Sequence, residues 1–208
     1  MKRQMLLDRL RQRNFSSKII KAFEKVKRKN FVPENIKKYA YEDTALPIGK
    51  KQTISQPYTI AVMLSLLNLR KNQRVLELGS GCGYVLALIS EIIGKKSQVF
   101  GVEIIKELAE KSKQNLKDYK NIEIYNLDGS EGLEEKSPFD RILISAALSV
   151  VPKSILNQLK EEGILVAPIG NKISQTIVAF QRKNNEFNVL KEMPGFIFVP
   201  FISEGNLK

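Results

Sequence analysis

The 208-residue sequence contains no histidine and only one cysteine, Cys82. Without histidine, imidazole acid–base catalysis, Ser-His-Asp or Cys-His catalytic sites and His-ligated metal sites are all excluded. One cysteine also excludes a disulfide framework and Cys-cluster zinc sites. We therefore expect no metal site, and a chemistry that needs little proton transfer or takes its reactivity from a cofactor.

Long apolar runs are also missing. No stretch approaches the roughly 18 apolar residues of a membrane span, and the start of the chain lacks the apolar run and cleavage site of a secretory signal. A basic transit peptide is disfavoured because apolar residues recur at helical spacing, which indicates two amphipathic helices. We expect a cytoplasmic protein that does not bind a membrane.

The net charge of +12 is concentrated at the N-terminus. The first 30 residues hold eleven Lys and Arg against Asp8 and Glu24, so this segment carries +9 of the total. Such a charge raises the prospect of a polyanionic partner. The solvated faces of two packed helices explain the same charge, and we favour that interpretation.

Alternating strand and helix patterns begin near residue 74. Strand-like 74–78, 98–103, 122–127, 141–145 and 164–167 alternate with helical 85–93 and 106–116, after helices in the first 40 residues and from 58 to 69. This order predicts an α/β fold with a mostly parallel central sheet and helices on both faces. The strand-like segments 176–181, 189–193 and 196–201 predict antiparallel edge strands and a strand-rich C-terminus.

A glycine cluster follows the first of these strands. The segment Gly79-Ser80-Gly81-Cys82-Gly83 stands between a strand and a helix, where glycines let a ligand approach the backbone at a helix N-terminus. Its spacing is G-x-G-x-G, whereas a dinucleotide-binding loop would need its third glycine where Tyr84 stands. The loop therefore indicates a different nucleoside cofactor.

Three acidic residues accompany this cluster. Glu77 precedes it and could pair with a cationic amino-acid group, Glu103 ends the next strand where a carboxylate accepts ribose hydroxyls, and Asp128 follows the third strand near an adenine position. Each acid alone could be merely solvated. Together they indicate a Rossmann-like class I methyltransferase that uses S-adenosyl-L-methionine, whose sulfonium is already activated.

Motifs and residue types that the sequence lacks limit the possible acceptors of the methyl group. The strand ending Ile144-Ser145-Ala146 is not followed by the Asn/Asp-Pro-Pro-aromatic segment typical of nucleobase amine methylation. Cys82 lies inside the cofactor loop. We interpret it as a small residue that the loop tolerates rather than as a nucleophile. A carboxylate acceptor is ionised at neutral pH and needs alignment rather than a base.

The sequence resembles the protein-L-isoaspartate O-methyltransferase family along essentially its whole length. The resemblance is carried by Tyr41–Gly49, Gln52–Tyr58, Arg74–Tyr84, Asp128-Gly129, Ser137–Asp140, Gln158–Gly163, Pro168–Gly170 and Phe198–Phe201. It implies methyl transfer to the α-carboxylate of L-isoaspartyl residues in damaged proteins and peptides, a reaction that initiates their repair. It also implies one domain, with N-terminal helices and a substrate-side loop in 1–57, a cofactor-binding core in 58–170 and C-terminal strands in 171–208.

The resemblance also implies roles for individual residues. Ser55 matches the family's active-site serine, which we interpret as a hydrogen-bond donor to the acceptor carboxylate; its alternative role is to cap the helix after Pro57. The implied cofactor-binding residues are Glu77, Gly79, Ser80, Gly81, Gly83, Glu103, Asp128 and Gly129. The implied substrate-binding residues are Ile54, Tyr58, Val199 and Pro200.

The effect of one departure from the family is undecided, and two alternative functions stay open. Lys50-Lys51 stands in a loop that usually has glycine, which bears on loop closure or substrate preference. An RNA methyltransferase would use the basic N-terminus, and a cofactor-binding protein without catalysis would leave Ser55 unexplained. We expect a monomer that acts on proteins or peptides containing isoaspartate and has no stable nucleic-acid partner.

Overall fold

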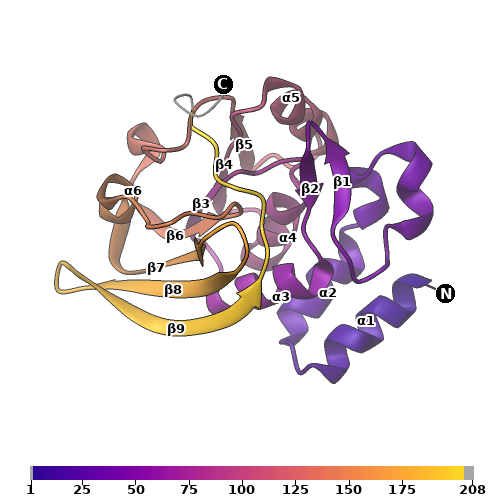
Figure 1. Cartoon of the computed structure of the whole chain (residues 1–208), viewed down its shortest axis with the longest axis horizontal. Coiled ribbons are helices and arrows are strands. Elements are labelled where there is room, and N and C mark those ends of the chain that lie inside the picture. The colour runs from indigo at the N-terminus through magenta and orange to yellow at the C-terminus, as the bar shows by residue number, and fades with distance from the viewer. Residues whose placement is uncertain (1, 204–208) are drawn as a thin grey trace.

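A mostly parallel β-sheet runs through the middle of the computed structural model, which describes residues 2–203 (Figure 1). Residue 1 and residues 204–208, the end of the predicted C-terminal section, lie outside the described residues. The strands of this sheet are β3 (Arg74–Leu78), β4 (Gln98–Val102), β5 (Ile122–Tyr125), β6 (Phe139–Ile144), β7 (Leu159–Gly170), β8 (Gln175–Lys183) and β9 (Glu186–Phe196).

The strand order is β5-β4-β3-β6-β7-β8-β9. Strands β3 to β7 run parallel to one another, whereas β8 pairs antiparallel with both β7 and β9. The chain moves outward from β3 to β5 and then returns to place β6 on the other side of β3. The carboxyl ends of β3 and β6 therefore form the point where the strand order reverses, which is the usual ligand position in such sheets.

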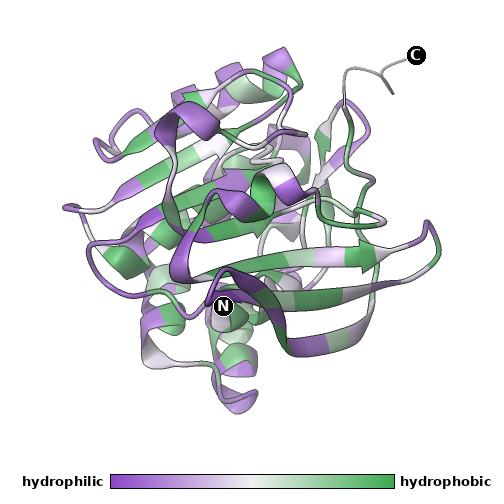
Figure 2. Cartoon of the chain, turned by 90° about the vertical axis from the view of Figure 1, so that its left-hand side faces the viewer, coloured by the Kyte–Doolittle hydropathy of each residue, from purple (hydrophilic) through white to green (hydrophobic). Residues whose placement is uncertain are grey.

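Side chains alternate along β3 between the two faces of the sheet. Val75 belongs to the apolar cluster on one face, and Leu76 and Leu78 belong to the cluster on the other. The buried strands are apolar while the outer helix surfaces are polar (Figure 2). The helices flanking the sheet are α3 (Pro57–Leu66), α4 (Tyr84–Ile93), α5 (Lys106–Asn115), the 3₁₀ turn η3 (Glu134–Lys136) and α6 (Lys153–Asn157).

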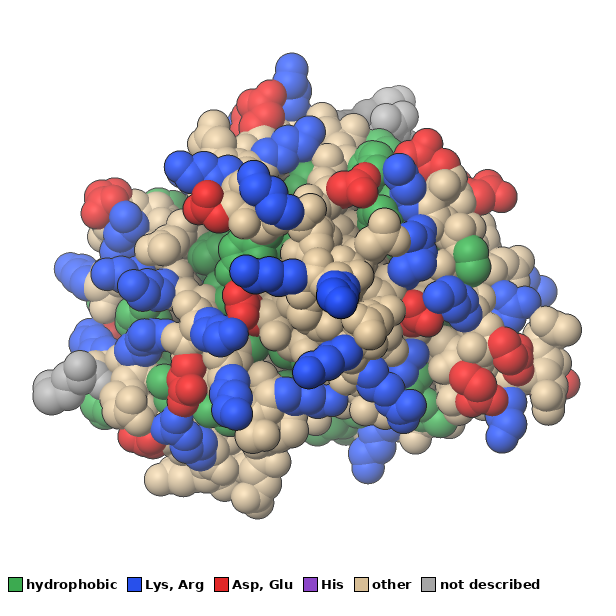
Figure 3. Space-filling view, turned by 180° about the vertical axis from the view of Figure 1, so that it is seen from behind, with side chains coloured by type: hydrophobic (Ala, Val, Ile, Leu, Met, Phe, Trp, Pro, Cys, Tyr) green, Lys and Arg blue, Asp and Glu red, His purple; other side chains and the backbone are tan. Residues whose placement is uncertain are grey.

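The basic N-terminal segment is helical, as its apolar spacing predicts. Leu6, Leu10 and Phe23 are buried in the same apolar cluster as α3 and α4, which leaves most of the basic side chains in water. Figure 3 shows Lys and Arg spread over one face and interspersed with Asp and Glu. The elements of this segment are α1 (Lys2–Gln12), α2 (Ser17–Lys25) and the 3₁₀ turns η1 (Arg28–Phe31) and η2 (Glu34–Tyr39).

Two segments differ from the sequence-based expectation. The expected strand 196–201 is an extended segment with a single bridge between Pro200 and Ala147, because it leaves the sheet and crosses the carboxyl ends of the parallel strands. The stretch around Leu46, which lies outside the helices and strands predicted from the sequence, pairs as a short hairpin of β1 (Leu46–Gly49) and β2 (Gln52–Ile54). Within residues 2–203, no helix has the length and apolar character to cross a membrane.

Candidate active site

The glycine loop after β3 forms the floor of a narrow cavity. Gly81 lines this cavity at φ +54°, and a Cβ there would lie 3.2 Å from Ile48 Cδ1. Gly83 serves packing instead, because a Cβ at its position would lie 2.4 Å from Ser112 Oγ on α5. The first part of the loop thus leaves its backbone open to a ligand, and the last part lets α4 and α5 approach closely.

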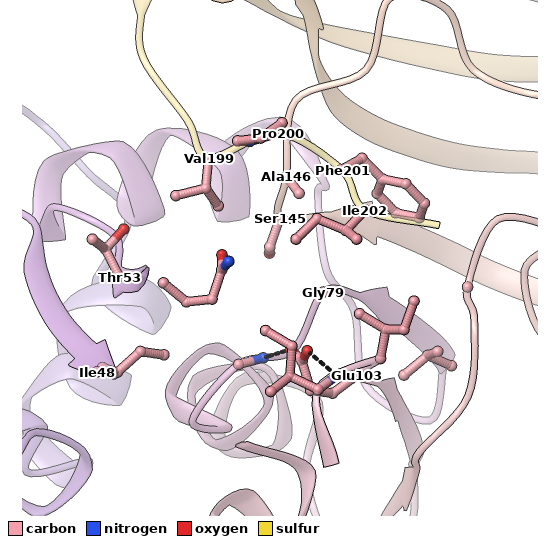
Figure 4. A pocket seen from close by; sticks show the side chains of 16 residues that line it. Ile48, Thr53, Gly79, Glu103, Ser145, Ala146, Val199, Pro200, Phe201 and Ile202 are labelled. Atoms are coloured by element: carbon pink, nitrogen blue, oxygen red, sulfur yellow. Dashed lines mark hydrogen bonds between the residues drawn. The ribbon is translucent and has the colours of Figure 1, made fainter. Parts of the chain in front are cut away.

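Glu103 stands beside this loop at the end of β4 (Figure 4). Its carboxylate accepts hydrogen bonds from the backbone N–H of Gly81 at 2.7 Å and of Ile105 at 2.9 Å. Burial raises the pKa of Glu103, and these backbone donors oppose that increase. Each carboxylate oxygen can accept a further hydrogen bond, so Glu103 is oriented to receive two ligand hydroxyls.

Glu77 is buried at the carboxyl end of β3 with 1% of its surface exposed. The Ser145 hydroxyl, just after β6, donates to Glu77 Oε1 at 2.6 Å, while Oε2 has no hydrogen-bond partner among the described residues. Burial raises the pKa of Glu77 to about 8. An unpaired buried carboxylate oxygen is costly, and a cationic ligand group would satisfy it.

Two segments cover the cavity. Ile48 and Thr53 come from the β1–β2 hairpin on one side, and Val199 to Ile202 come from the C-terminal segment on the other (Figure 4). Ala147 holds the C-terminal segment because its N–H donates to Val199 O and its carbonyl accepts from Phe201 N–H, both at 2.8 Å. The cavity measures about 60 Å³. Both segments therefore border the space that a nucleoside would occupy.

A larger groove of about 930 Å³ lies on the outer side of the same segments. Thr53, Ser145 and Val199 line both the cavity and the groove, so the two spaces meet at these side chains. Ser55 and Tyr58 line the groove, and β9 and the residues after it form the opposite wall. A group in the cavity and a group in the groove would thus meet beside Thr53 and Ser145.

Ser55 does not cap helix α3. The N-cap residue is Gln56, and Asp43 Oδ1 accepts the Tyr58 N–H at 2.9 Å in the place of a serine cap. The Ser55 hydroxyl makes no hydrogen bond within residues 2–203, which removes the capping alternative. The Ser55 hydroxyl is available to a ligand in the groove.

The predicted cofactor-binding residues fall into two groups. Gly79, Gly81, Glu103 and Gly129 line the cavity directly. The others are not among the residues that line it, and Asp128 accepts a hydrogen bond from Ser130 N–H at 2.8 Å. The residues of this second group are Glu77, Ser80, Gly83 and Asp128.

The predicted substrate-binding residues are also divided. Tyr58 and Val199 line the groove, Pro200 lines the cavity, and Ile54 is buried in the apolar core. Ile54 thus stabilises the hairpin rather than bordering the groove. Thr53 and Ser145 are not among the site residues predicted from the sequence, although Ser145 follows a strand beside the point where the sheet order reverses.

Cys82 and the lysine pair take structural roles. Cys82 is buried within the glycine loop, and burial raises the pKa of its thiol to about 12, so no thiolate forms at neutral pH. Lys50 and Lys51 adopt positive φ angles at the tip of the β1–β2 hairpin. Lys50 forms an ion pair with Glu107 in the first turn of α5.

Known proteins are similar to this one over nearly its whole length. The family model described as "Protein-L-isoaspartate(D-aspartate) O-methyltransferase (PCMT)" matches residues 1–206. The chain belongs to the protein-L-isoaspartate O-methyltransferase family. It is 44% identical to protein-L-isoaspartate O-methyltransferase 2 of Archaeoglobus fulgidus, covering 100% of this chain and 95% of that protein. It is 43% identical to the Yersinia enterocolitica enzyme of the same name, covering 96% and 95%.

Solved structures of the family share the fold. A protein-L-isoaspartate O-methyltransferase structure superposes with a TM-score of 0.87 at 31% identity, covering 99% of this chain and 67% of that one. A Plasmodium falciparum relative in complex with S-adenosyl-L-homocysteine superposes with a TM-score of 0.81 at 27% identity, covering 95% and 97%. The fold is thus the class I methyltransferase fold that the strand pattern predicts.

Proposed function

We propose that this chain transfers the methyl group of S-adenosylmethionine to the α-carboxylate of L-isoaspartyl residues in proteins and peptides. The observation that carries this proposal is the meeting of a cofactor-type cavity and an open groove at Thr53, Ser145 and Val199, beside the hydroxyl of Ser55. The cofactor would supply an electrophilic methyl group on a sulfonium. No nucleic-acid acceptor is supported by the family to which the chain belongs.

Three carboxylates suit the cofactor. Glu77 offers an unpaired buried oxygen to its amino-acid cation, and Glu103 offers oriented oxygens to its ribose hydroxyls. Gly81 lets the ligand lie close to the backbone. Asp128 and the backbone of Gly129 follow β5 near the same cavity, and we assign them to the adenine end.

The groove suits an extended peptide. Its volume of about 930 Å³ and its open side allow flanking residues of varied size, and Tyr58 and Phe196 stack at a centroid separation of 6.5 Å to form an apolar wall. We assign Tyr58, Val199 and Pro200 to contacts with this peptide or with its junction to the cavity. We assign the Ser55 hydroxyl to a hydrogen bond with the acceptor carboxylate.

The reaction needs no general base, which fits a chain without histidine. The acceptor is ionised at neutral pH. One carboxylate oxygen forms the new bond to the methyl carbon, the sulfur–methyl bond breaks, and the charges of carboxylate and sulfonium are both cancelled without moving a proton. The protein must therefore align the two groups and exclude water, which the covering hairpin and C-terminal segment are placed to do.

A direct assay tests the proposal. The protein is incubated with methyl-labelled cofactor and three separate acceptors: a peptide containing L-isoaspartate, the same peptide containing L-aspartate, and bulk tRNA. We expect base-labile label on the isoaspartyl peptide alone. Label on tRNA, or equal label on both peptides, would contradict the proposed acceptor.

A further inference from the structure

Arg28 lies at the start of η1, and its side chain is fully buried beneath the substrate-side segments. Within residues 2–203 its guanidinium has no carboxylate partner, and it donates to five backbone carbonyls. The acceptors are the carbonyl oxygens of Ala40 at 2.9 Å, Glu42 at 3.4 Å, Thr44 at 3.0 Å, Ile54 at 3.4 Å and Ser55 at 3.1 Å. Arg28 thus connects the loop before β1 to the segment that leads into α3.

The positive charge of Arg28 is not neutralised by an ion pair among residues 2–203. Burial lowers the pKa of Arg28, but an arginine stays protonated in proteins. Asp43 acts on it only at longer range, since Asp43 accepts the Tyr58 N–H and faces Arg13 Nη1 at 3.9 Å. Carbonyl dipoles orient the guanidinium without cancelling its charge.

This charge lies directly behind the wall of the groove. The same residue, Ser55, gives its carbonyl to Arg28 and borders the groove, and Thr44 does likewise. Arg13 and Lys191 also border the groove, but both are exposed and water screens their charge. The charge of Arg28 is buried and separated from the groove by one segment of backbone, so water screens its effect on a ligand there much less.

We propose that Arg28 is a positioning residue that holds Ser55 in place and puts a buried positive charge behind it, so that the groove selects an ionised carboxylate as methyl acceptor. The inference rests on the proposed function, because it concerns the same acceptor. Arg28 would then contribute to acceptor selectivity without contacting the acceptor.

Two peptides of nearly the same shape, which differ in the charge of the acceptor group, test whether Arg28 acts on that charge. One carries L-isoaspartate with a free α-carboxylate, and the other is identical but carries an α-carboxamide. Their dissociation constants are measured by fluorescence anisotropy with S-adenosylhomocysteine present, so that no turnover occurs. In Arg28→Gln we expect the carboxylate peptide to bind roughly tenfold more weakly, at the low end of the effect of a neighbouring charge, and the carboxamide peptide to change less than twofold.

Arg28→Lys keeps the charge while giving up several hydrogen bonds. We expect it to retain the preference for the carboxylate peptide even where both peptides bind more weakly. A purely structural role for Arg28 would weaken both peptides equally in Arg28→Gln, and that result would overturn the proposal. Lys191→Gln is the exposed control, and an equal loss of preference there would also overturn it.

A second measurement does not depend on changing the buried arginine. Ser55→Ala removes the hydroxyl but leaves Arg28 and the Ser55 carbonyl, so the carboxylate peptide should still bind several-fold more tightly than the carboxamide. Equal binding of the two peptides by Ser55→Ala would assign the preference to the hydroxyl and overturn the role of Arg28. Methylation of the carboxylate peptide by the unmodified chain tests the proposed function separately.

Discussion

The hydroxyl of Ser55 borders the groove without a hydrogen-bond partner in the part of the chain that the structure describes. A serine whose hydroxyl neither caps a helix nor bonds the backbone contributes little to stability. Its role must then appear in the reaction rather than in the fold.

Substitution of Ser55 by alanine tests that role. We expect kcat/KM with an isoaspartyl peptide to fall about tenfold to a hundredfold, because a lost hydrogen bond to a charged group costs on the order of 1.5–3 kcal/mol. Cofactor affinity should change less than twofold, since Ser55 lines the groove and not the cavity. Steady-state kinetics together with cofactor titration measure both quantities, and an equal loss of cofactor affinity would contradict this placement.

Glu77 makes folding stability depend on pH. In the unfolded chain its pKa is near the ordinary value of 4.5, and in the folded chain burial raises it to about 8. Between these values the folded protein holds a proton that the unfolded chain has released, so stability falls as the pH rises from about 4.5 to about 8.

Glu77→Gln removes this dependence because the amide stays neutral. Without added cofactor, we expect the variant to have a higher Tm than the unmodified protein at pH 8 and nearly the same Tm near pH 4.5. Thermal unfolding at pH 5, 6.5 and 8 measures the difference. The same variant should bind cofactor more weakly, and parallel Tm curves across this pH range would contradict the pKa assigned to Glu77.

At the scale of elements, the contact between α4 and α5 depends on Gly83. An alanine there would combine an unfavourable positive φ of +83° with contacts of 2.4 Å to Ser112 Oγ and 2.6 Å to Leu116 Cδ1. We expect Gly83→Ala to lower the free energy of unfolding by about 2–4 kcal/mol, from backbone strain and overpacking together.

Gly94 provides a comparison without new packing contacts. Its φ of +86° is also positive, but its ψ of 164° places it in a region that almost only glycine occupies, whereas Gly83 has a ψ of 8°. A Cβ at Gly94 would have no atom within 4 Å, so Gly94→Ala should cost the backbone strain alone, about 1–3 kcal/mol. Urea unfolding measures the loss in each variant, and a loss of only about 1–2 kcal/mol in Gly83→Ala, the strain alone, would show that α5 tolerates the added methyl group.

Strand and helix positions were largely predictable from the sequence, because each buried element has a local apolar pattern. The 74–78 strand and the segments around α4 and α5 lie where the alternation places them. The hairpin around Leu46 was not predictable, because a four-residue strand containing Pro47 has no clear alternation. The segment after Phe196 has strand-like composition, yet its path over the sheet is decided by bonds to Ala147.

At the scale of the whole molecule, the site is enclosed by segments far apart in the sequence. The β1–β2 hairpin and the C-terminal segment cover the cavity from opposite sides (Figure 4). The Lys50–Glu107 ion pair connects the hairpin to α5. We expect cofactor exchange to involve movement of at least one of these two segments.

Lys50→Gln tests the contribution of this ion pair. We expect S-adenosylhomocysteine to dissociate about two- to threefold faster from the variant, a modest change because exposed ion pairs are weak and screened. The dissociation rate should also lose part of its dependence on salt. Stopped-flow fluorescence measures the rate, and Lys51→Gln is the control because no ion pair of Lys51 occurs in residues 2–203.

The sequence by itself determined the alternation that fixes the fold class, the glycine loop with its acidic residues, and the exclusion of histidine chemistry. These features are local, since each depends on residues close together in the chain. Only the tertiary structure decided that Thr53 and Ser145 stand where the cavity meets the groove, and that Arg28 is buried behind Ser55. In the sequence, nothing distinguishes Arg28 from the other basic residues of its segment. Its burial depends on backbone carbonyls from two other segments, which only folding brings together.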